Sequence, residues 1–398
     1  MFPYTPWMII AIAALAGAAL MAFFFRKRPK ALPIALAAGG LAGAIGSLIF
    51  MGPLDFCTFE PERSSLDVGF GVFLIAIGVI GMSLPVRWLL NRLFDRTPVF
   101  VPQTQQGAFK GWLAPVLLLA PTIVILALFL YYPSFETFTL STQLARLGAR
   151  RSIFICVDNF TALLTDPVYG QVVITTLFMS IAIVVIGLAL SLLIATMAYQ
   201  PIRGASIYRT LLIWPYAISP VVAGVIFLLL FNPTGGIINF FLNSTFGFGV
   251  PWLTSPTYAP WAVIIASVWK SMGFNILFYI AGLQNVPKDL LEAASIDGAN
   301  ALKRFRYVVL PTLSPITFFL IITNMTYAFF DTFGTIDALT GGGPLRSTTT
   351  MMYNIYQIGI LNNDLGKAAA QSIVLFAMVI GLTYLQFRTT ARQVTYGA

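Results

Sequence analysis

Nine long apolar stretches constrain the fold of this chain more than any other feature. The hydrocarbon core of a bilayer is about 30 Å thick, so a helix that spans it needs about 20 mainly apolar residues. The stretches that qualify are Trp7–Phe25, Pro33–Gly52, Val68–Val86, Trp112–Tyr132, Val172–Ala198, Leu211–Phe231, Trp261–Leu283, Thr312–Phe333 and Ala370–Phe387. They are continuous and much longer than membrane β-strands need to be. We therefore predict an all-α integral membrane protein with about nine transmembrane helices.

Charged residues avoid these stretches. Only 9% of the 398 residues are charged, against about 25% in an ordinary soluble domain. Of the 23 basic and 14 acidic side chains, only Lys270 and Asp331 lie inside the predicted spans. This distribution excludes a cytosolic enzyme, and the apolar richness of the chain excludes a disordered protein.

The basic residues also predict an orientation. Met1–Pro6 carries no side-chain charge and a basic cluster follows the first span at Arg26–Lys30, which argues against a cleaved signal peptide. If the N-terminus is outside, the cytoplasmic segments hold 16 Lys and Arg residues and the external segments hold 6. Cytoplasmic segments carry the basic excess in membrane proteins. We therefore predict the N-terminus outside and the C-terminus inside. The net charge of +9 then reflects the excess of Lys and Arg on the cytoplasmic side and is no sign of nucleic-acid binding.

A polar linker around Pro98–Gly107 divides the chain. It predicts a three-helix N-terminal membrane extension with its linker at residues 1–106 and a six-helix transmembrane domain at residues 107–398. Two external segments stand out: Pro133–Gln171 is long enough for a small folded element, and Asn232–Pro260 is uncharged and rich in Gly, Pro and aromatic residues. In the second apolar stretch, small residues permit close helix packing; these are Ala37, Gly39, Gly40, Gly43 and Gly46.

The cytoplasmic segment between the seventh and eighth predicted spans has the pattern of two short helices. Lys288–Ile296 is predicted as a helix, with Asp289 and Glu292 at the end where the helix dipole favours negative charge. Gly298 can adopt the positive φ that ends such a helix, and a second short helix is predicted over Ala299–Val309. The alternative is an ordinary amphipathic loop.

The same segment closely resembles the EAA loop of permease subunits of binding-protein-dependent ABC importers. The matching residues are Glu292, Ala293, Ala294, Gly298, Leu310 and Pro311. We call residues 288–311 the EAA loop. The resemblance implies that this loop couples the membrane helices to an ATPase subunit, through Glu292, Ala293, Ala294, Asp297, Gly298, Leu310 and Pro311.

Further strings extend the resemblance from about Trp112 to the C-terminus. Within the carbohydrate-type importers they are most similar to the sn-glycerol-3-phosphate permease subunits. These strings include Pro215-Tyr216-Ala217, Phe231-Asn232-Pro233, Ser267-Val268-Trp269-Lys270, Tyr327–Phe333, Gly342-Gly343-Pro344 and Ala370-Gln371-Ser372. The cargo implied is sn-glycerol 3-phosphate or a related glycerophosphodiester, with a neutral sugar or oligosaccharide as the alternative.

The resemblance also implies a set of partners and a location. A second homologous permease subunit would complete the pathway, two ATPase subunits would use ATP and Mg²⁺, and an extracytoplasmic binding protein would deliver the cargo to the bacterial inner membrane. The chain itself has no GxxxxGK[ST] phosphate loop. We expect no catalytic residues, cofactor or metal in it, because it has no histidine, only two cysteines and no clustered carboxylates. A secondary transporter is the competing class, but the intramembrane charges are too few for a proton relay.

Lys270 is the deepest charged residue, near the middle of its predicted span. A cation at that depth costs about 2.5–3.5 kcal/mol or more, so it faces the bundle interior or a water-filled cavity. One interpretation is contact with the phosphate of a substrate. The other is a structural role, such as an ion pair with Asp331, although Asp331 lies near the outer end of its span.

Other polar residues in the spans have two readings as well. They either bind substrate hydroxyls or form interhelical hydrogen bonds, the more frequent use; these residues are Asn275, Asn324, Tyr327 and Gln371. Pro215, Pro220 and Pro315 interrupt their predicted helices and suit either a hinge or a packing kink.

Two further candidate features lie in the segments that are predicted to be external. The turn Gly341–Pro344, with Arg346 beside it, either helps to receive the binding protein, as the resemblance implies, or is a plain loop. Cys57 and Cys156 both map to external segments, where an oxidising compartment permits a disulfide.

Overall fold

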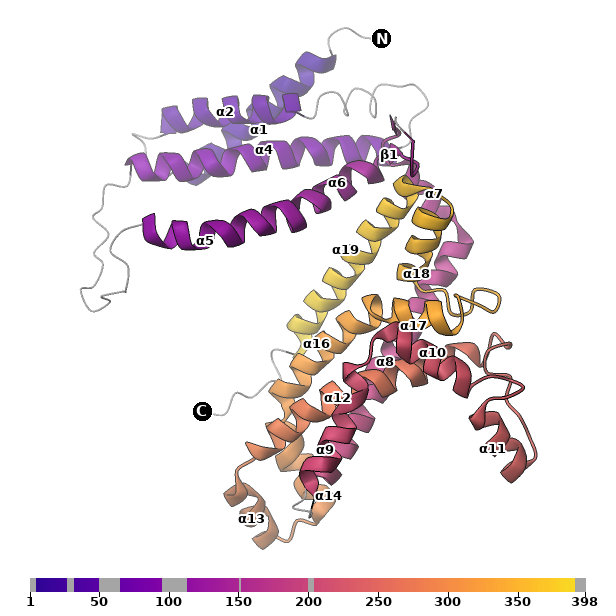
Figure 1. Ribbon diagram of the computed structural model, residues 1–398. Coiled ribbons are helices and arrows are strands. Elements are labelled where there is room, and N and C mark those ends of the chain that lie inside the picture. Colours follow the sequence, from indigo (N-terminus) through magenta and orange to yellow (C-terminus); the bar gives the residue numbers. More distant parts are fainter. Residues whose placement is uncertain are drawn as a thin grey trace. The chain divides into compact units, whose positions relative to one another are not determined.

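The computed structural model describes residues 5–26, 32–49, 65–94, 113–149, 152–199 and 204–390. Over these ranges the chain is helical apart from one two-stranded antiparallel sheet (Figure 1). The all-α prediction is therefore confirmed. The chain divides into two compact units, Met1–Ala162 with Asp364–Ala370, and Leu163–Asn363 with Gln371–Ala398, which are described separately. The predicted boundary at residues 106 and 107 lies outside the described residues.

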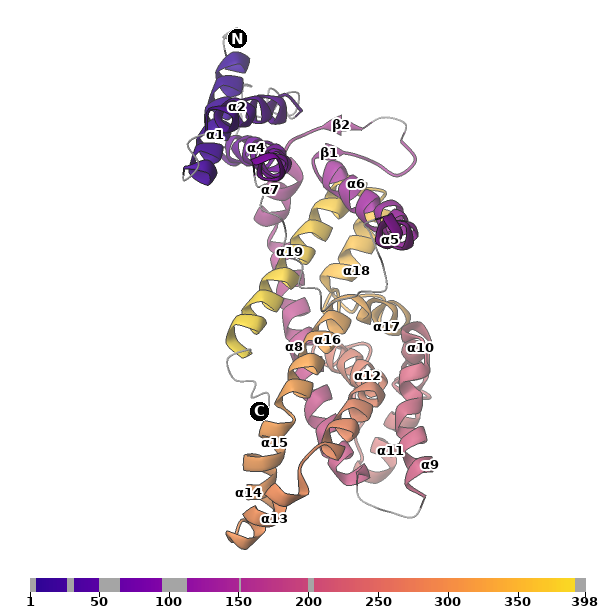
Figure 2. The same ribbon diagram turned by 90° about the vertical axis from the view of Figure 1, so that its left-hand side faces the viewer.

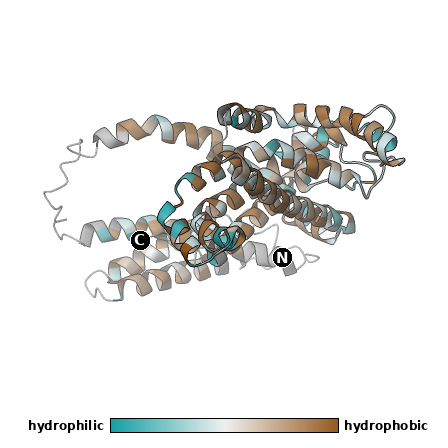
Figure 3. Cartoon of the chain, turned by 90° about the horizontal axis from the view of Figure 1, so that it is seen from below, coloured by the Kyte–Doolittle hydropathy of each residue, from teal (hydrophilic) through white to brown (hydrophobic). Residues whose placement is uncertain are grey.

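The described residues hold five helices that are long and apolar enough to cross a membrane. They are Leu117–Ser141, Pro167–Ala198, Ala259–Gln284, Ser314–Leu339 and Leu365–Arg388. A sixth crossing is formed if the pair Ile207–Ala217 and Pro220–Leu230, bent by 101°, counts as one span. These six match the last six predicted spans. Figure 3 shows that hydrophobic residues make up much of the length of the helices, as expected of helices in a membrane.

The first three predicted spans are helices as well. They are α1 (Thr5–Phe25), α2 (Leu32–Ile49) and α4 (Ser65–Phe94). Their described apolar cores are shorter than 18 residues, so the total of nine crossings and their direction stay predictions.

Small residues join these three helices, as the sequence indicated. A side chain at Gly39 would clash with the carbonyl oxygen of Gly17 on α1, and one at Gly43 would clash with that of Ala13. A side chain at Gly46 would meet the backbone of Gly78 on α4. Without side chains the backbones approach closely, which is how small residues stabilise helix pairs in lipid.

The next crossing consists of α5 (Leu113–Leu126), the π-helical turn η1 (Ala127–Tyr131) and α6 (Tyr132–Ser141). The end of α6 leads into the expected small folded element. Strands β1 (Gln143–Leu144) and β2 (Ile153–Phe154) then pair antiparallel, with Gln143 opposite Phe154, and α7 (Asp158–Thr165) follows. The prediction of a folded element in Pro133–Gln171 is confirmed.

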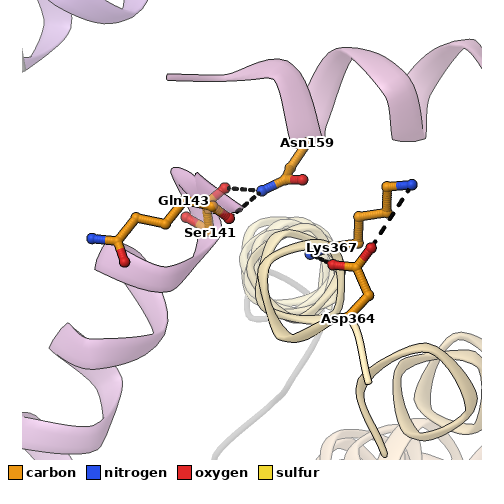
Figure 4. A network of polar contacts seen from close by, with 5 residues as sticks. All are labelled: Ser141, Gln143, Asn159, Asp364 and Lys367. Atoms are coloured by element: carbon orange, nitrogen blue, oxygen red, sulfur yellow. Dashed lines mark hydrogen bonds and ion pairs between the residues drawn. The ribbon is translucent and has the colours of Figure 1, made fainter. Parts of the chain in front are cut away.

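The buried amide of Asn159 holds this element together (Figure 4). Its Nδ2 donates hydrogen bonds to the carbonyl oxygens of Ser141 at 2.9 Å and Gln143 at 3.0 Å. The backbone nitrogen of Gly366, at the start of the last helix, donates to the carbonyl oxygen of Ala145 at 3.1 Å. Asp364 accepts from the backbone of Lys367 and forms a 3.9 Å ion pair with its Nζ. One amide therefore fixes the chain between α6 and β1.

Cys156 follows β2 and is disulfide-bonded. Cys57, the only other cysteine in the sequence, lies outside the described residues.

The predicted span Leu211–Phe231 is not one helix. It is broken into α9 (Ala205–Ile213), the 3₁₀ turn η2 (Trp214–Ala217) and α10 (Pro220–Leu230). Pro215 lies in the turn and Pro220 begins α10, so the interruption expected from these prolines is confirmed. Pro315 is different, because it lies in the first turn of its helix, where proline needs no hydrogen-bond partner.

The second unit is built around α12 (Ala259–Gln284), the most buried of its long helices. It packs on α8 (Pro167–Ala198), α16 (Ser314–Phe330) and the broken span (Figure 2). Gly273 on α12 allows this contact, because a Cβ there would lie 2.8 Å from the carbonyl oxygen of Ile213. The core includes Met179, Ile183, Phe227, Ile276, Tyr279 and Leu320.

Shorter elements complete this unit. α11 (Ile237–Phe246) lies between α10 and α12, and α13 (Lys288–Ile296), α14 (Ala301–Arg304), η3 (Phe305–Val309) and α15 (Leu310–Thr312) form the EAA loop. After α16 come α17 (Thr332–Leu339), α18 (Met351–Tyr356), the π-helical turn η4 (Gln357–Leu361) and α19 (Leu365–Thr390).

Replacing the buried amide tests the account of the external element. Asn159→Ala should lower the free energy of unfolding by about 1–3 kcal/mol, because it leaves buried carbonyl oxygens without donors. Thermal unfolding of the purified protein in detergent measures the change. Gln143→Ala is the control, because only the backbone of Gln143 accepts from Asn159. Equal melting temperatures for the two variants would contradict the role of the amide.

Candidate functional site

Lys270 lies near the middle of α12 and only 6% of its surface is exposed. Two tyrosine rings face its Nζ, that of Tyr327 on α16 at 4.9 Å and that of Tyr216 in η2 at 5.5 Å. Cation–π contacts at these distances offset part of the cost of burying the charge. Three separate elements therefore converge on one ammonium group.

Lys270 has no direct ionic partner among the described residues, although Asp331 acts on its charge electrostatically from beyond ion-pair distance. Within the described part of the chain its Nζ has no hydrogen bond and no ion pair. Asp331 is exposed at the C-terminal end of α16 and forms no ion pair with it. The buried hydroxyl of Tyr327 also has no hydrogen-bond partner among the described residues. A buried cation and a buried hydroxyl, both unpaired, are the groups that an anionic ligand satisfies.

Tyr216 was not among the site residues predicted from the sequence. It is 46% exposed, so it is the open side of the group around Lys270. Its ring also begins a row of aromatic contacts, to Phe274 at 5.2 Å and on through Phe278 to Phe319. Its position just after Pro215, at a helix break, was the available signal.

Asn275 and Asn324 satisfy each other. Each side-chain Nδ2 donates to the other's Oδ1, at 3.0 Å and 2.6 Å, and Asn324 also donates to the carbonyl oxygen of Leu320. Both residues are buried, on α12 and α16 respectively. The interhelical reading of these two amides is thus the one that the structure shows, and the pair fixes α12 against α16.

Gln371 is likewise used between helices. Its Oε1 accepts a 2.9 Å hydrogen bond from Nδ2 of Asn354, so α19 is joined to α18. The six predicted pathway residues are Lys270, Asn275, Asn324, Tyr327, Asp331 and Gln371. The structure brings Lys270 together with Tyr327, and Asn275 together with Asn324.

The EAA loop has the predicted first helix, because α13 covers Lys288–Ile296. Gly298 follows with φ +77°, and the backbone nitrogen of Ala299 donates to the carbonyl oxygen of Ala294 at 2.9 Å, the helix-ending bond that a left-handed glycine allows. The single helix predicted over Ala299–Val309 is wrong in detail. α14 starts at Ala301, where Asn300 caps it, and gives way to the π-helical turn η3.

The loop folds as a helix–turn–helix with a side-chain link that the sequence did not reveal. Arg304 donates to the hydroxyl of Ser295, which itself donates to the carbonyl oxygen of Leu291. No residue of α13, α14, η3 or α15 is buried. The loop thus leaves large apolar side chains uncovered, namely Leu290, Ile296, Leu302 and Tyr307. Such an exposed apolar surface marks an interaction site.

Side-chain hydrogen bonds hold the turn Gly341–Pro344, which the sequence predicts to be external. The hydroxyls of Thr348 and Thr349 donate to the carbonyl oxygens of Gly343 and Gly342, at 2.8 Å and 2.9 Å. Leu345 and Arg346 both have positive φ, and Leu345 is 90% exposed. Beside them, Val168, Gln171 and Thr175 of α8 help to line a cavity of about 250 Å³.

The asparagine pair can be tested by comparing single and double substitutions. Asn275→Leu should destabilise the protein by about 1–3 kcal/mol, because it leaves the buried amide of Asn324 unpaired. Adding Asn324→Leu should restore part of the loss, since replacing both partners removes the unpaired group. Melting temperatures of the parent protein, Asn275→Leu and the double variant in detergent give the result. A double variant no more stable than Asn275→Leu would contradict the pairing.

Comparison with known proteins places this architecture in a family. Residues 187–390 match the family described as binding-protein-dependent transport system inner membrane component. The sn-glycerol-3-phosphate transport system permease protein UgpA of Yersinia enterocolitica is 46% identical over 293 residues, which are 74% of this chain and 99% of that protein. The protein of the same name from Brucella abortus is 42% identical over 294 residues, 73% of this chain and 99% of that protein.

A solved structure shares the fold. A chain of a bacterial alginate ABC transporter, crystallised in complex with an alginate pentasaccharide-bound periplasmic protein, superposes with a TM-score of 0.63. The match covers 72% of this chain and 96% of that one at 23% identity, which supports the fold alone. Together with the sequence relatives, it leads to one conclusion. This chain belongs to the family of binding-protein-dependent transport system inner membrane components.

Proposed function

We propose that this chain is a permease subunit of an ATP-driven ABC importer that carries sn-glycerol 3-phosphate or a related glycerophosphodiester across the inner membrane. The relatives that match nearly over their full length bear the name of a glycerol-3-phosphate permease. The observation that carries the cargo assignment is the buried Lys270, unpaired among the described residues and flanked by Tyr216 and Tyr327.

The phosphate of the cargo supplies what this group lacks. A phosphate oxygen next to Nζ of Lys270 gives the buried cation a counter-charge, and a charge-assisted hydrogen bond to phosphate is about twice as strong as a neutral one. The hydroxyl of Tyr327, which has no partner among the described residues, can donate to another phosphate oxygen. A neutral sugar would leave the charge unpaired, so the site selects for an anion.

The EAA loop is the proposed coupling point to an ATPase. Its exposed apolar residues, held on a compact helix–turn–helix, suit a groove on a partner protein. In the complete transporter, two ATPase subunits would use ATP and Mg²⁺, and their closure would move the EAA loops of this chain and of a second permease. The helices attached to the loop, α12 and α16, carry Lys270 and Tyr327, so the motion reaches the cargo site directly.

The turn Gly341–Pro344 is the proposed contact for the binding protein. It presents Leu345 and Arg346 on a backbone that threonine hydroxyls hold in place. Because the backbone of the turn is already ordered, it loses little conformational entropy when a partner protein binds. The bacterial alginate ABC transporter that shares this fold was crystallised in complex with a periplasmic protein.

The proposal includes nine spans, with the N-terminus outside and three helices in front of a six-helix permease domain. The relatives are covered nearly completely by 73–74% of this chain, which leaves about a quarter of the chain for an extension. The sided distribution of Lys and Arg supports the orientation.

Lys270→Met separates a role in cargo binding from a structural role. Uptake of glycerol 3-phosphate by the reconstituted transporter should fall at least tenfold, because about 1.4 kcal/mol of lost interaction is already a factor of ten. The melting temperature should stay the same or rise, because the variant removes a buried charge that has no ionic partner. Lys367→Met, which removes an exposed cation outside the site, should leave uptake intact.

Retention of uptake in Lys270→Met would refute the phosphate contact. Loss of folded protein in Lys270→Met, with uptake per folded molecule unchanged, would instead assign Lys270 a structural role.

A pair of glycine variants tests the coupling role of the EAA loop. Gly298 and Gly247 both have positive φ and both have open space around the Cβ position. Valine at either position therefore adds similar backbone strain, about 1–2 kcal/mol. Gly298→Val should abolish the stimulation of ATP hydrolysis by cargo-loaded binding protein, whereas Gly247→Val should retain it. Equal ATPase rates in the two variants would contradict the coupling role, and Glu292→Ala provides a second test in the same assay.

A further inference from the structure

Helix α11 is too short to cross a membrane and yet it is apolar. It has ten residues, Ile237–Phe246, so it is about 15 Å long, about half the thickness of the hydrocarbon core. It follows α10 in the chain and precedes the N-terminal end of α12, whereas the EAA loop follows the C-terminal end of α12 (Figure 1). No residue of α11 belongs to the proposed cargo site, the EAA loop or the turn Gly341–Pro344.

Hydrogen bonds of two asparagine side chains fix α11 to its surroundings. The side-chain oxygen of Asn232 accepts hydrogen bonds from the backbone nitrogens of Thr234 and Gly235, at 3.0 Å and 3.1 Å, and turns the chain after α10. The buried side chain of Asn239 exchanges hydrogen bonds with the backbone of Val250, at 3.0 Å and 3.2 Å. One face of α11 is thereby anchored to the following loop.

The opposite face is exposed and mainly apolar. Ile237, Phe240 and Phe241 lie three and four residues apart, on one side of the helix, and are 69%, 76% and 59% exposed. Ser244 lies on the same face, where its hydroxyl donates to the carbonyl oxygen of Phe241. A stable helix in water would turn charged or polar side chains outward in these positions.

The absence of charge around α11 identifies the covering material as lipid. The sequence has no charged side chain between Arg209 and Lys270, so the whole segment from α10 through α11 into α12 is uncharged. The other external segment, Pro133–Gln171, carries charges of both signs, as expected for a surface in water. The neighbouring helix α10 also exposes apolar side chains, at Val225 and Leu229.

We propose that α11 is an interfacial helix that inserts its Ile237–Phe240–Phe241 face into the lipid leaflet on the side opposite to the EAA loop. An amphipathic helix in this position lies in the plane of the membrane, with its apolar face at the boundary of headgroups and acyl chains. Trp252 and Tyr258, in the loop that follows, are of the residue types that gather at that boundary. The helix anchors the outer ends of α10 and α12 at a fixed depth.

Nitroxide accessibility tests this proposal in the assembled transporter. Phe240→Cys, Phe241→Cys and Leu345→Cys are each spin-labelled, and the complexes are placed in vesicles of phosphatidylcholine and phosphatidylglycerol without binding protein. Oxygen concentrates in lipid and nickel chelates stay in water, so the ratio of their collision rates reports the environment. Leu345 is the matched control, an apolar residue that is 90% exposed beside Arg346. The parent chain, in which Cys156 is disulfide-bonded, sets the labelling background.

The oxygen-to-nickel ratio should be several-fold higher at positions 240 and 241 than at position 345. A ratio at 240 and 241 equal to that at 345 would place α11 in water and overturn the proposal. Low collision rates with both reagents would show that a protein surface covers this face, and that outcome would also overturn it. Measuring two adjacent labelled positions ensures that failure of one variant to assemble leaves the test intact.

Discussion

A membrane leaves a buried charge two ways to be stabilised: a partner within the protein, or a partner that arrives from solution. Among the described residues Lys270 has no hydrogen bond and no ion pair; the rings of Tyr327 and Tyr216 face its Nζ at 4.9 Å and 5.5 Å, and Asp331 acts on it only from a longer distance. The cost of this arrangement, about 2.5–3.5 kcal/mol or more at mid-membrane depth, is tolerable when an anion is the group to be bound. The proposed cargo site depends on this incomplete compensation, because an ion pair with Asp331 would weaken the attraction for phosphate.

Three structural features hold Lys270 where it is. The broken span brings Tyr216 to α12, and Gly273 provides the space for that contact. The reciprocal amides of Asn275 and Asn324 fix α16, and therefore Tyr327, against α12. Because α12 and α16 also lead into and out of the EAA loop, the same two helices hold the cargo site and receive the motion of the ATPase in the mechanism proposed here.

Hydrophobic length and charge placement predicted the helical class and the last six spans, because lipid allows few alternatives for an apolar run of 20 residues. The first helix of the EAA loop could also be predicted from the sequence, because Gly298 can adopt a positive φ and α13 ends just before it. The hydrogen-bond partners of the side chains could not be predicted from the sequence. Whether Asn275 faces cargo or Asn324 depends on the rotation of two helices, which periodicity does not fix when a span is apolar on every side. Tyr216 was missed for a similar reason, because the 101° bend that brings it to Lys270 arises from the path of the backbone after Pro215.

The most direct measurement of the central claim is the structure of the assembled transporter, determined by electron cryomicroscopy with glycerol 3-phosphate bound between the two permease subunits. We predict a phosphate oxygen within hydrogen-bond distance of Nζ of Lys270, with the rings of Tyr216 and Tyr327 on either side. A phosphate bound elsewhere, with Nζ of Lys270 paired to a carboxylate of either permease, would contradict it.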